Sequence, residues 1–548
     1  MCNLSRKADA SLESLHRVFT IPEEQNSTLG RIEREISENL EGFLQSHIVA
    51  VEKDLTDVEL DFSDASIPKQ PIFVSEQADF LLDKLVSHSV HTASPSFVGH
   101  MTSALPYFML PLSKIMIALN QNLVKTETSK SFTPLERQVT GMLHRLVYKG
   151  SDSFYQTYLH DQHYGLGAFC SGGTVANITA LWVARNNMFK ASEHFAGIHQ
   201  EGLAAGLVHH GFRGAAILVS ERGHYSLKKT ADILGLGANN IISIATDDDN
   251  RISIKALREK CDELKHAKIK IMAIVGIAGT TETGSVDPLD EMADIAVAND
   301  CHFHVDGAWG APTLFSKKYG PLLKGIERAD SVTIDAHKQL YIPMGAGLVV
   351  FKDPSALHSI EHHANYIIRK GSKDLGSKTL EGSRPGMAML VHSGLRILGE
   401  QGYELLIDQG IDKTCQFAQL IKQHPDFELC SEPTLNILTY RYCPNWLKPH
   451  LAQAEPEKVH AINEVLNRYT KYLQKVQRGR GKAFVSRTQL TPSCYQQQAI
   501  VVFRVVLANP LTSMQILEDI LTEQAMLANE PEANRYIDKL KALVTEIA

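Results

Sequence analysis

The chain has 548 residues, of which 44% are hydrophobic and 21% charged, and its formal net charge at pH 7 is −7. This length is too great for a single hydrophobic core, and the dispersed charges of both signs exclude the strongly basic surface of a protein that binds nucleic acid or anionic membranes. Eight cysteines without CxxC spacing, no signal-peptide-like N-terminus and no apolar run of membrane-spanning length predict a cytoplasmic protein with reduced thiols and a small-molecule ligand.

Residues 1–75 are polar and acid-rich, but apolar residues recur among them at helical spacing. These residues are Leu29, Ile32, Ile36, Leu40, Phe43 and Leu44. The spacing predicts one amphipathic helix, whose apolar stripe packs either on the chain's own core or on a second subunit.

A loop punctuated by proline and serine follows at residues 94–106 and carries His100 and Thr102. Loops held by a rigid scaffold often carry binding groups, so these two residues are candidates for substrate contact. Further along, Thr133 and Glu136 have the spacing of a capping box around a proline, which predicts a helix that begins at Thr133 and runs through Leu146.

From about Gly165 to Phe351 apolar, β-rich runs alternate with helical patterns. The predicted strands are 215–220, 241–245, 269–277, 301–305, 331–334 and 346–351, and the predicted helices are 175–189, 254–264 and 289–298. Strands that are apolar throughout indicate a sheet covered on both faces, hence a mainly parallel α/β layer. Ligands of such sheets bind at the carboxyl ends of the strands.

Beyond Gly402 the pattern becomes α+β. It contains a proline-rich connection at 444–456, a helix marked by Val459, Ile462, Leu466, Tyr469 and Leu473, strand-like runs at 483–485 and 499–506, and a closing helix from Ser513. We therefore expect a helical, dimerising segment at 1–110, a large α/β domain at 111–400 and a small α+β domain at 401–548.

Three loops follow predicted strands and carry groups that suit a phosphorylated, planar ligand. The Ser-Gly-Gly-Thr turn at 171–174 opens a helix, so its N–H groups and the Thr174 hydroxyl can hold a phosphate, although a tight turn alone would also need these glycines. His224 lies after the next strand and can stack on a flat ring and exchange protons. Thr281 lies in the loop 278–284 and is a further contact candidate.

The most informative stretch contains Asp306 at the end of a strand and Lys338 in a later His-Lys pair. An acid and a lysine so placed suit an aldehyde cofactor, because the acid pairs with the protonated ring nitrogen and the lysine bonds to the aldehyde. His302, His304 and Asp306 alternate on one strand, however, and could instead begin the metal site of a hydrolase. A structural relative that binds partners without a cofactor is the third alternative.

As a set, these motifs resemble those of the group II pyridoxal-phosphate decarboxylases, over about residues 90–530. The shared motifs are Ser-Gly-Gly-Thr at 171–174, His-Tyr-Ser at 224–226, Gly-Thr-Thr at 279–281, His-Val-Asp-Gly-Ala-Trp at 304–309, Ala-Asp-Ser-Val-Thr at 329–333, Asp-Ala-His-Lys at 335–338, Gly-Ser-Arg at 382–384, Phe-Arg at 503–504 and Asn-Pro at 509–510. The resemblance implies a type I aminotransferase-like fold, pyridoxal 5'-phosphate as cofactor, and a homodimer with active sites at the subunit interface.

The resemblance also assigns roles to individual residues. It implies that Lys338 bonds to the cofactor, that Asp306 pairs with the ring nitrogen, and that His224 and Ala308 lie against the two ring faces. It further implies that Gly173, Thr174 and His337 hold the phosphate and that Arg504 binds the α-carboxylate of the substrate. The pattern is most similar to that of bacterial members that convert aspartate to β-alanine, a pantothenate precursor, with glutamate as the alternative substrate.

Two departures from the family pattern concern catalysis and specificity. Many members carry a tyrosine on a loop after the lysine that protonates the substrate carbon, but residues 370–380 contain none, and Tyr366 matches a different position. Either another group, such as His224, donates that proton, or side reactions are commoner here. His100 and Thr102 stand where glutamate decarboxylases have a glutamine and a serine, which is consistent with an acid of another length, such as aspartate.

Overall fold

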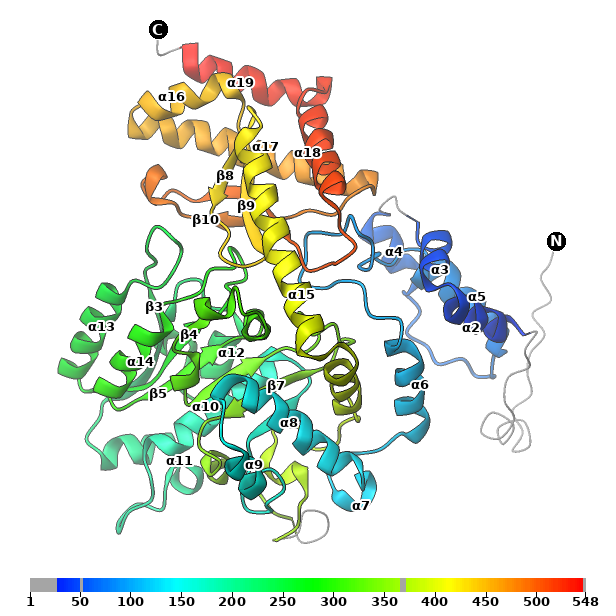
Figure 1. Cartoon of the computed structure of the whole chain (residues 1–548). Helices are drawn as coiled ribbons and strands as arrows, with labels where there is room; N and C mark the ends of the chain where they lie inside the picture. Colours follow the sequence, from blue (N-terminus) through cyan, green and yellow to red (C-terminus); the bar gives the residue numbers. More distant parts are fainter. Residues whose placement is uncertain (1–26, 50–52, 365–370, 546–548) are drawn as a thin grey trace.

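The computed structural model describes residues 27–49, 53–364 and 371–545. Figure 1 shows three parts: a helical arm near the N-terminus, a large body around one sheet, and a smaller C-terminal body around a second sheet. The second sheet is joined to the large body by the long helix α15 (Ala388–Gln423). No helix within the described ranges combines the length and apolar character needed to cross a membrane.

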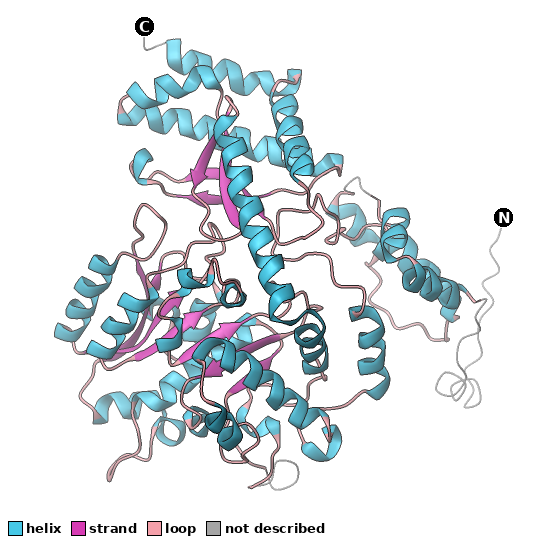
Figure 2. Cartoon of the chain, in the orientation of Figure 1, coloured by secondary structure: helices cyan, strands magenta, loops and turns pink. Residues whose placement is uncertain are grey.

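The large body is built on a seven-stranded sheet of order β1-β7-β6-β5-β4-β2-β3 (Figure 2). Its strands are β1 (Gly167–Cys170), β2 (Gly214–Ser220), β3 (Ile241–Ile244), β4 (Ile269–Ile277), β5 (His302–Asp306), β6 (Ser331–Ile334) and β7 (Gly347–Phe351). The six strands predicted from apolar runs are confirmed to within one residue at either end. The mainly parallel character is also confirmed, because β2 to β6 pair in parallel and only β7 runs against its neighbours β6 and β1.

Helices cover both faces of this sheet, which explains why its strands are apolar throughout. The large body contains α6 (Met109–Leu119), α7 (Thr126–Ser129), α8 (Phe132–Tyr148), α9 (Asp152–Tyr158), α10 (Gly173–Met188), α11 (Ile198–His209), α12 (Ser226–Ile233), α13 (Ile254–His266) and α14 (Leu289–Ala298). One face packs against α8, α13 and α14, and the other packs against α10 and α12. The three helices predicted in this region correspond to α10, α13 and α14.

The C-terminal body is an antiparallel sheet of order β10-β11-β9-β8 covered by helices. It comprises β8 (Phe427–Ser431), β9 (Ile437–Tyr442), β10 (Ser486–Leu490), β11 (Ile500–Val506), α16 (Lys448–Gln453), α17 (Pro456–Arg480), α18 (Met514–Ala528) and α19 (Asn534–Thr545). The α+β character, α17, β11 and the closing helix agree with the sequence predictions. The strand predicted at 483–485 is wrong, since Phe484 makes only an isolated bridge, to Phe97, and β8, β9 and β10 were not predicted.

The arm contains α2 (Thr28–Glu38), α3 (Leu40–His47), α4 (Leu55–Asp61) and α5 (Val74–Phe80), followed by a π-helical turn at Leu81–Val86. The prediction of one helix through Leu44 is wrong, because the side chain of Asn39 accepts a hydrogen bond from the Gly42 N–H and so begins a new helix. The predicted capping box is also wrong. α8 begins at Phe132, the Thr133 hydroxyl bonds to that of Ser129, and Glu136 instead forms a buried ion pair with Arg384.

Candidate active site

A cavity of about 380 Å³ opens at the carboxyl ends of the central strands. All residues that the sequence assigned to cofactor binding line it: Gly173, Thr174, His224, Thr281, Asp306, Ala308, His337 and Lys338. They come from loops far apart in the chain, which meet because parallel strands end at one edge of the sheet. The three candidate substrate residues do not line the cavity, although Met101, between His100 and Thr102, does.

Asp306 ends β5 and is 7% exposed. Its Oδ2 accepts a hydrogen bond of 2.9 Å from the amide nitrogen of Asn177, and its Oδ1 accepts one of 3.2 Å from the Ala308 N–H. A donor on each oxygen fixes the plane of the carboxylate, so that Asp306 can present an acceptor to a group in the cavity.

Lys338 also lines the cavity and forms a 3.0 Å ion pair with Oδ2 of Asp335. Asp335 is 3% exposed, and its Oδ1 has no hydrogen-bond partner. The lysine amine is thus held in place by a buried acid that the sequence reasoning included in a motif but gave no role.

The Ser-Gly-Gly-Thr turn leads directly into α10, whose N-cap residue Gly172 makes no side-chain capping bond. A Cβ on Gly173 would lie 2.6 Å from Oδ2 of Asp335, and one on Gly172 would lie 3.3 Å from Cε1 of His337. Glycine at both positions therefore leaves the first-turn N–H groups accessible at the positive end of the helix dipole, which is an anion seat.

His224 is half-buried beside the cavity, and its Nδ1 lies 2.8 Å from the hydroxyl of Ser226. Burial lowers the pKa of His224, and Lys338 lowers it further, while Asp306 opposes the shift. The ring is therefore neutral near pH 7, with one nitrogen able to donate a proton and the other to accept one.

Arg504 lies on β11, next to the cavity wall. Its Nε donates a hydrogen bond of 2.6 Å to the carbonyl oxygen of Thr281, and burial lowers its pKa to about 10. Partial burial lowers the pKa of His100, and the positive charges of Arg504 and Lys338 lower it further. The Thr102 hydroxyl is buried without a partner.

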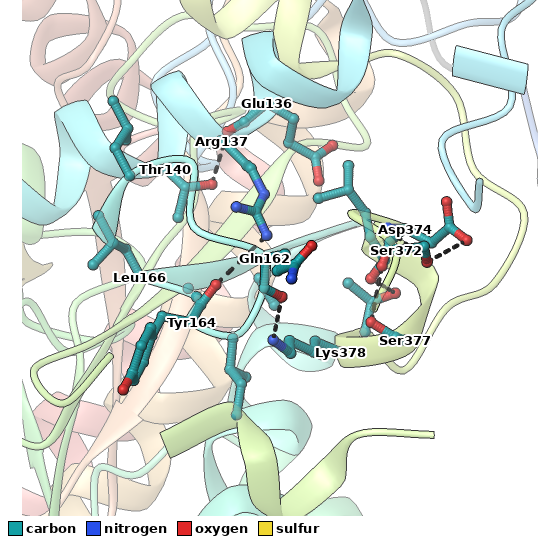
Figure 3. Close-up of a pocket in the computed structure, with 17 residues that line it drawn as sticks. Glu136, Arg137, Thr140, Gln162, Tyr164, Leu166, Ser372, Asp374, Ser377 and Lys378 are labelled. Carbon is teal, nitrogen blue, oxygen red and sulfur yellow. Dashed lines mark hydrogen bonds between the residues drawn. The ribbon is translucent and has the colours of Figure 1, made fainter. Parts of the chain in front are cut away.

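Figure 3 shows a second, smaller cavity of about 40 Å³, between α8 and the loops at 160–166 and 371–379. Its cations already have partners: Arg137 donates to the carbonyl oxygen of Asp161 at 2.5 Å, and Lys378 donates to that of His163 at 2.6 Å. The Lys378 contact joins the segments 371–379 and 160–166, and residues 371–380 contain no tyrosine. Tyr366 lies outside the described residues.

The alternating histidines of β5 meet at the hydroxyl of Ser331, which is not a metal ligand set. The ring of His304 is hydrogen-bonded to Ser331 and Asn177, and that of His302 to Ser331. Among the described residues no group of three His, Cys, Asp or Glu side chains is arranged to hold a metal ion. The geometry gives the metal-site alternative no support.

Several cavity residues were missed by the sequence reasoning. They are Asn177, Arg222, Tyr225, Trp309, Asp335 and Met344. Asn177 had a usable signal, since it is a polar residue one helical turn after Thr174 in an otherwise apolar helix face. Tyr225, Trp309 and Asp335 stand in the shared motifs, although no role was predicted for them. Arg222 and Met344 offered no signal, because only the fold reveals which side chains reach the cavity.

The lining suits the cofactor that the resemblance implies. An anion seat, a lysine, an acid fixed as an acceptor and a neutral histidine surround a cavity large enough for a small ligand. Asp335 belongs to this lining, and its Oδ1 has no hydrogen-bond partner. A group bound in the cavity can therefore change the ion pair between Asp335 and Lys338.

Comparison with known proteins identifies relatives of the whole chain. Residues 63–443 match the pyridoxal-dependent decarboxylase conserved domain. The chain is 61% identical over 528 residues to the aspartate 1-decarboxylase of Aliivibrio fischeri, covering 96% of both proteins. It is 30% identical over 370 residues to the aromatic-L-amino-acid decarboxylase of Bacillus atrophaeus, covering 66% of this chain and 69% of that one. The crystal structure of mouse CSAD superposes with a TM-score of 0.78 at 24% identity, covering 91% of this chain and 97% of that one, which confirms the predicted fold class.

Proposed function

The chain belongs to the family of pyridoxal-dependent decarboxylases, and from that premise we propose that it converts L-aspartate to β-alanine and CO2. The observation that carries the proposal is that Lys338, Asp306 and His224 line one cavity. Aspartate is favoured by the identity to the Aliivibrio fischeri enzyme over nearly the whole chain. Glutamate is the second candidate, because it carries the same α-carboxylate that we assign to Arg504 and differs from aspartate by one methylene in its acidic side chain.

We assign the cofactor contacts as follows. Lys338 anchors pyridoxal phosphate covalently, and Asp306 accepts a hydrogen bond from its protonated ring nitrogen. Gly173, Thr174 and His337 hold the phosphate at the start of α10. When bound, the cofactor accepts the electron pair that loss of CO2 leaves on the substrate.

The remaining residues act on the substrate and on the faces of the ring. His224 and Ala308 lie against the two ring faces, Thr281 contributes to the wall, and Arg504 binds the α-carboxylate. In the absence of a loop tyrosine between residues 371 and 380, we assign the return of a proton to the substrate carbon to the neutral His224.

Reduction with borohydride tests the assignment of Lys338. The purified protein with pyridoxal phosphate is expected to be yellow, to lose that colour on reduction, and to carry the reduced cofactor on Lys338 alone. A metal-dependent hydrolase would instead contain zinc and remain colourless, and a cofactor-free binding protein would show neither property.

Specificity is tested at His100. We expect His100→Gln, which restores the residue of glutamate decarboxylases, to raise the ratio of glutamate to aspartate turnover, because the amide replaces an imidazole beside Arg504. His199→Gln, the same change at an exposed histidine of α11, serves as the matched control and should leave the preference unchanged. An unchanged preference in His100→Gln would remove His100 from substrate selection.

The active form is proposed to be a homodimer with its sites at the interface. The arm supports this, because among its described residues up to Val86 only Phe43 and Ala78 are buried, while apolar side chains such as Leu55, Leu60 and Ile67 are exposed. An apolar cavity of about 620 Å³ also separates the arm from α6. So much uncovered apolar surface is typical of an interface, and we assign it to a second copy. Sedimentation equilibrium at twice the monomer mass is expected; a monomer with full activity would contradict the assignment.

We place the enzyme in the cytoplasm. The described cysteines form no disulfide, which is consistent with a reducing compartment, and the ligand is a small amino acid rather than a nucleic acid or membrane. Cell fractionation with an antibody against the protein tests this placement.

A further inference from the structure

A chain of hydrogen bonds links the histidines of β5 to both Asp306 and His224, and it branches at Asn177. Asn177, on α10, lines the cavity and is 1% exposed, and His304, on β5, is 0% exposed. The amide nitrogen of Asn177 lies 2.9 Å from Oδ2 of Asp306 and 3.3 Å from the hydroxyl of Ser226. Its amide oxygen lies 3.1 Å from Nε2 of His304.

The first branch runs from His304 through Asn177 to Asp306, and the carboxylate at its end fixes the direction of each hydrogen bond. Because the carboxylate of Asp306 can only accept, the nitrogen of Asn177 must face it, and the amide oxygen must face His304. Nε2 of His304 must then carry a proton and donate it. Burial lowers the pKa of His304 to about 4, so the ring is neutral near pH 7, and its Nδ1 accepts from the Ser331 hydroxyl at 2.8 Å.

The second branch fixes the tautomer of His224. The other amide proton of Asn177 is directed at the Ser226 oxygen, so the Ser226 hydroxyl is free to donate its own proton to Nδ1 of His224 at 2.8 Å. The backbone N–H of Ser226 also points to that nitrogen, at 3.3 Å. With Nδ1 occupied as an acceptor, neutral His224 carries its proton on Nε2.

We propose that Asn177 and His304 are positioning residues, which together hold Asp306 as an oriented acceptor and hold His224 in its Nε2–H tautomer. The His-x-His-x-Asp run of β5 thus belongs to a buried chain of hydrogen bonds with fixed donors and acceptors. Its residues do not act as metal ligands. A buried polar network can also be kept for stability alone, so the two roles must be separated experimentally. This inference rests on the proposed function, because both controlled residues face the cofactor cavity.

A matched pair of substitutions at His304 separates the positioning role from a role in stability alone. Glutamine reaches the place of Nε2 and can donate to Asn177, whereas asparagine reaches only the place of Nδ1 and leaves the amide oxygen of Asn177 without a donor. The measurements are the dissociation constant of pyridoxal phosphate by equilibrium dialysis, the 15N chemical shift of the labelled ring nitrogen in the holoenzyme, and kcat with aspartate. Melting temperatures of the cofactor-free variants report stability separately.

We expect His304→Gln to stay within about threefold of the unmodified enzyme and His304→Asn to lose about 10- to 100-fold in cofactor affinity and kcat, with a shifted 15N signal. Equal values for the two variants would overturn the proposal. If neither variant folds, Asn177→Asp decides, because it keeps the shape of the side chain but removes both donated hydrogen bonds. Unchanged cofactor affinity and 15N shift in Asn177→Asp would also overturn the proposal. An unmodified protein that binds no pyridoxal phosphate would instead refute the proposed function.

Discussion

Replacing Asp306 with asparagine is the sharpest perturbation of the proposed chemistry, because it removes one negative charge without changing shape. The carboxylate accepts one hydrogen bond on each oxygen, from Asn177 and from the Ala308 N–H. An asparagine can accept only one of them and turns its own amide protons toward the other donor. The substitution therefore alters both the charge that the ring nitrogen meets and the local hydrogen bonding.

The magnitude follows from the burial of Asp306, which is 7% exposed. An unsatisfied buried donor costs about 1–3 kcal/mol of stability. Removal of one partner from a buried charge pair costs about 3–5 kcal/mol, and each 1.36 kcal/mol is tenfold in rate, so kcat should fall by about 10²- to 10⁴-fold. Because Lys338 is unchanged, the variant should still carry cofactor.

The assay measures CO2 release from aspartate together with the borohydride-reducible cofactor on Lys338. Asp300→Asn, the same change at a fully exposed acid just before β5, is the matched control and should be as active as the unmodified enzyme. An Asp306→Asn protein with cofactor bound and kcat within about threefold of the control would refute the role of Asp306, since 3 kcal/mol alone predicts more than a hundredfold loss.

Three further outcomes follow from the structure. Lys338→Ala should bind pyridoxal phosphate without a reducible bond, and a label found by mass spectrometry on another lysine would contradict the assignment. Arg384→Ala should lower the free energy of unfolding by about 3–5 kcal/mol, measured by urea denaturation, because Glu136 would remain buried without its partner; an unchanged midpoint would show that the pair adds no stability. Burial lowers the pKa of His144 to about 4, whereas an unfolded histidine titrates near ~6.5, so the free energy of unfolding should fall as the pH is lowered between these values, and His144→Gln should flatten that fall in urea titrations.

The fold of the large body could be predicted from the sequence because its strands are buried on both faces and read as uninterrupted apolar runs. Ile269–Ile277 and Ser331–Ile334 have the predicted bounds. The antiparallel direction of β7 was harder to predict from the sequence. It depends on the connection at 335–346, which contains no helix to carry the chain back for a parallel pairing. The break at Asn39 depended on a single side-chain hydrogen bond that spacing does not reveal, and α8 begins at Phe132 without any side-chain cap.

That the residues assigned to the cofactor line one cavity could be predicted, because each lies at or after the end of a strand and the sheet brings strand ends together. Asn177 and Asp335 could not, since their significance depends on contacts with Asp306 and Lys338 that only folding creates. The sequence likewise raised a metal site at His302 and His304 that the hydrogen bonds of their rings do not support. The substrate residues remain predictions, because specificity depends on the details of side-chain placement around Arg504.

The identity of the amine that the enzyme forms is the most direct test of the proposed decarboxylation of aspartate. The purified protein, supplied with pyridoxal phosphate, is offered aspartate, glutamate, 2,4-diaminobutyrate and an aromatic amino acid in separate reactions, and the products are identified by mass spectrometry. We expect β-alanine and CO2 from aspartate, at a kcat/KM above that for the other three amino acids. Formation of a different amine in preference, or of none, would contradict that proposal.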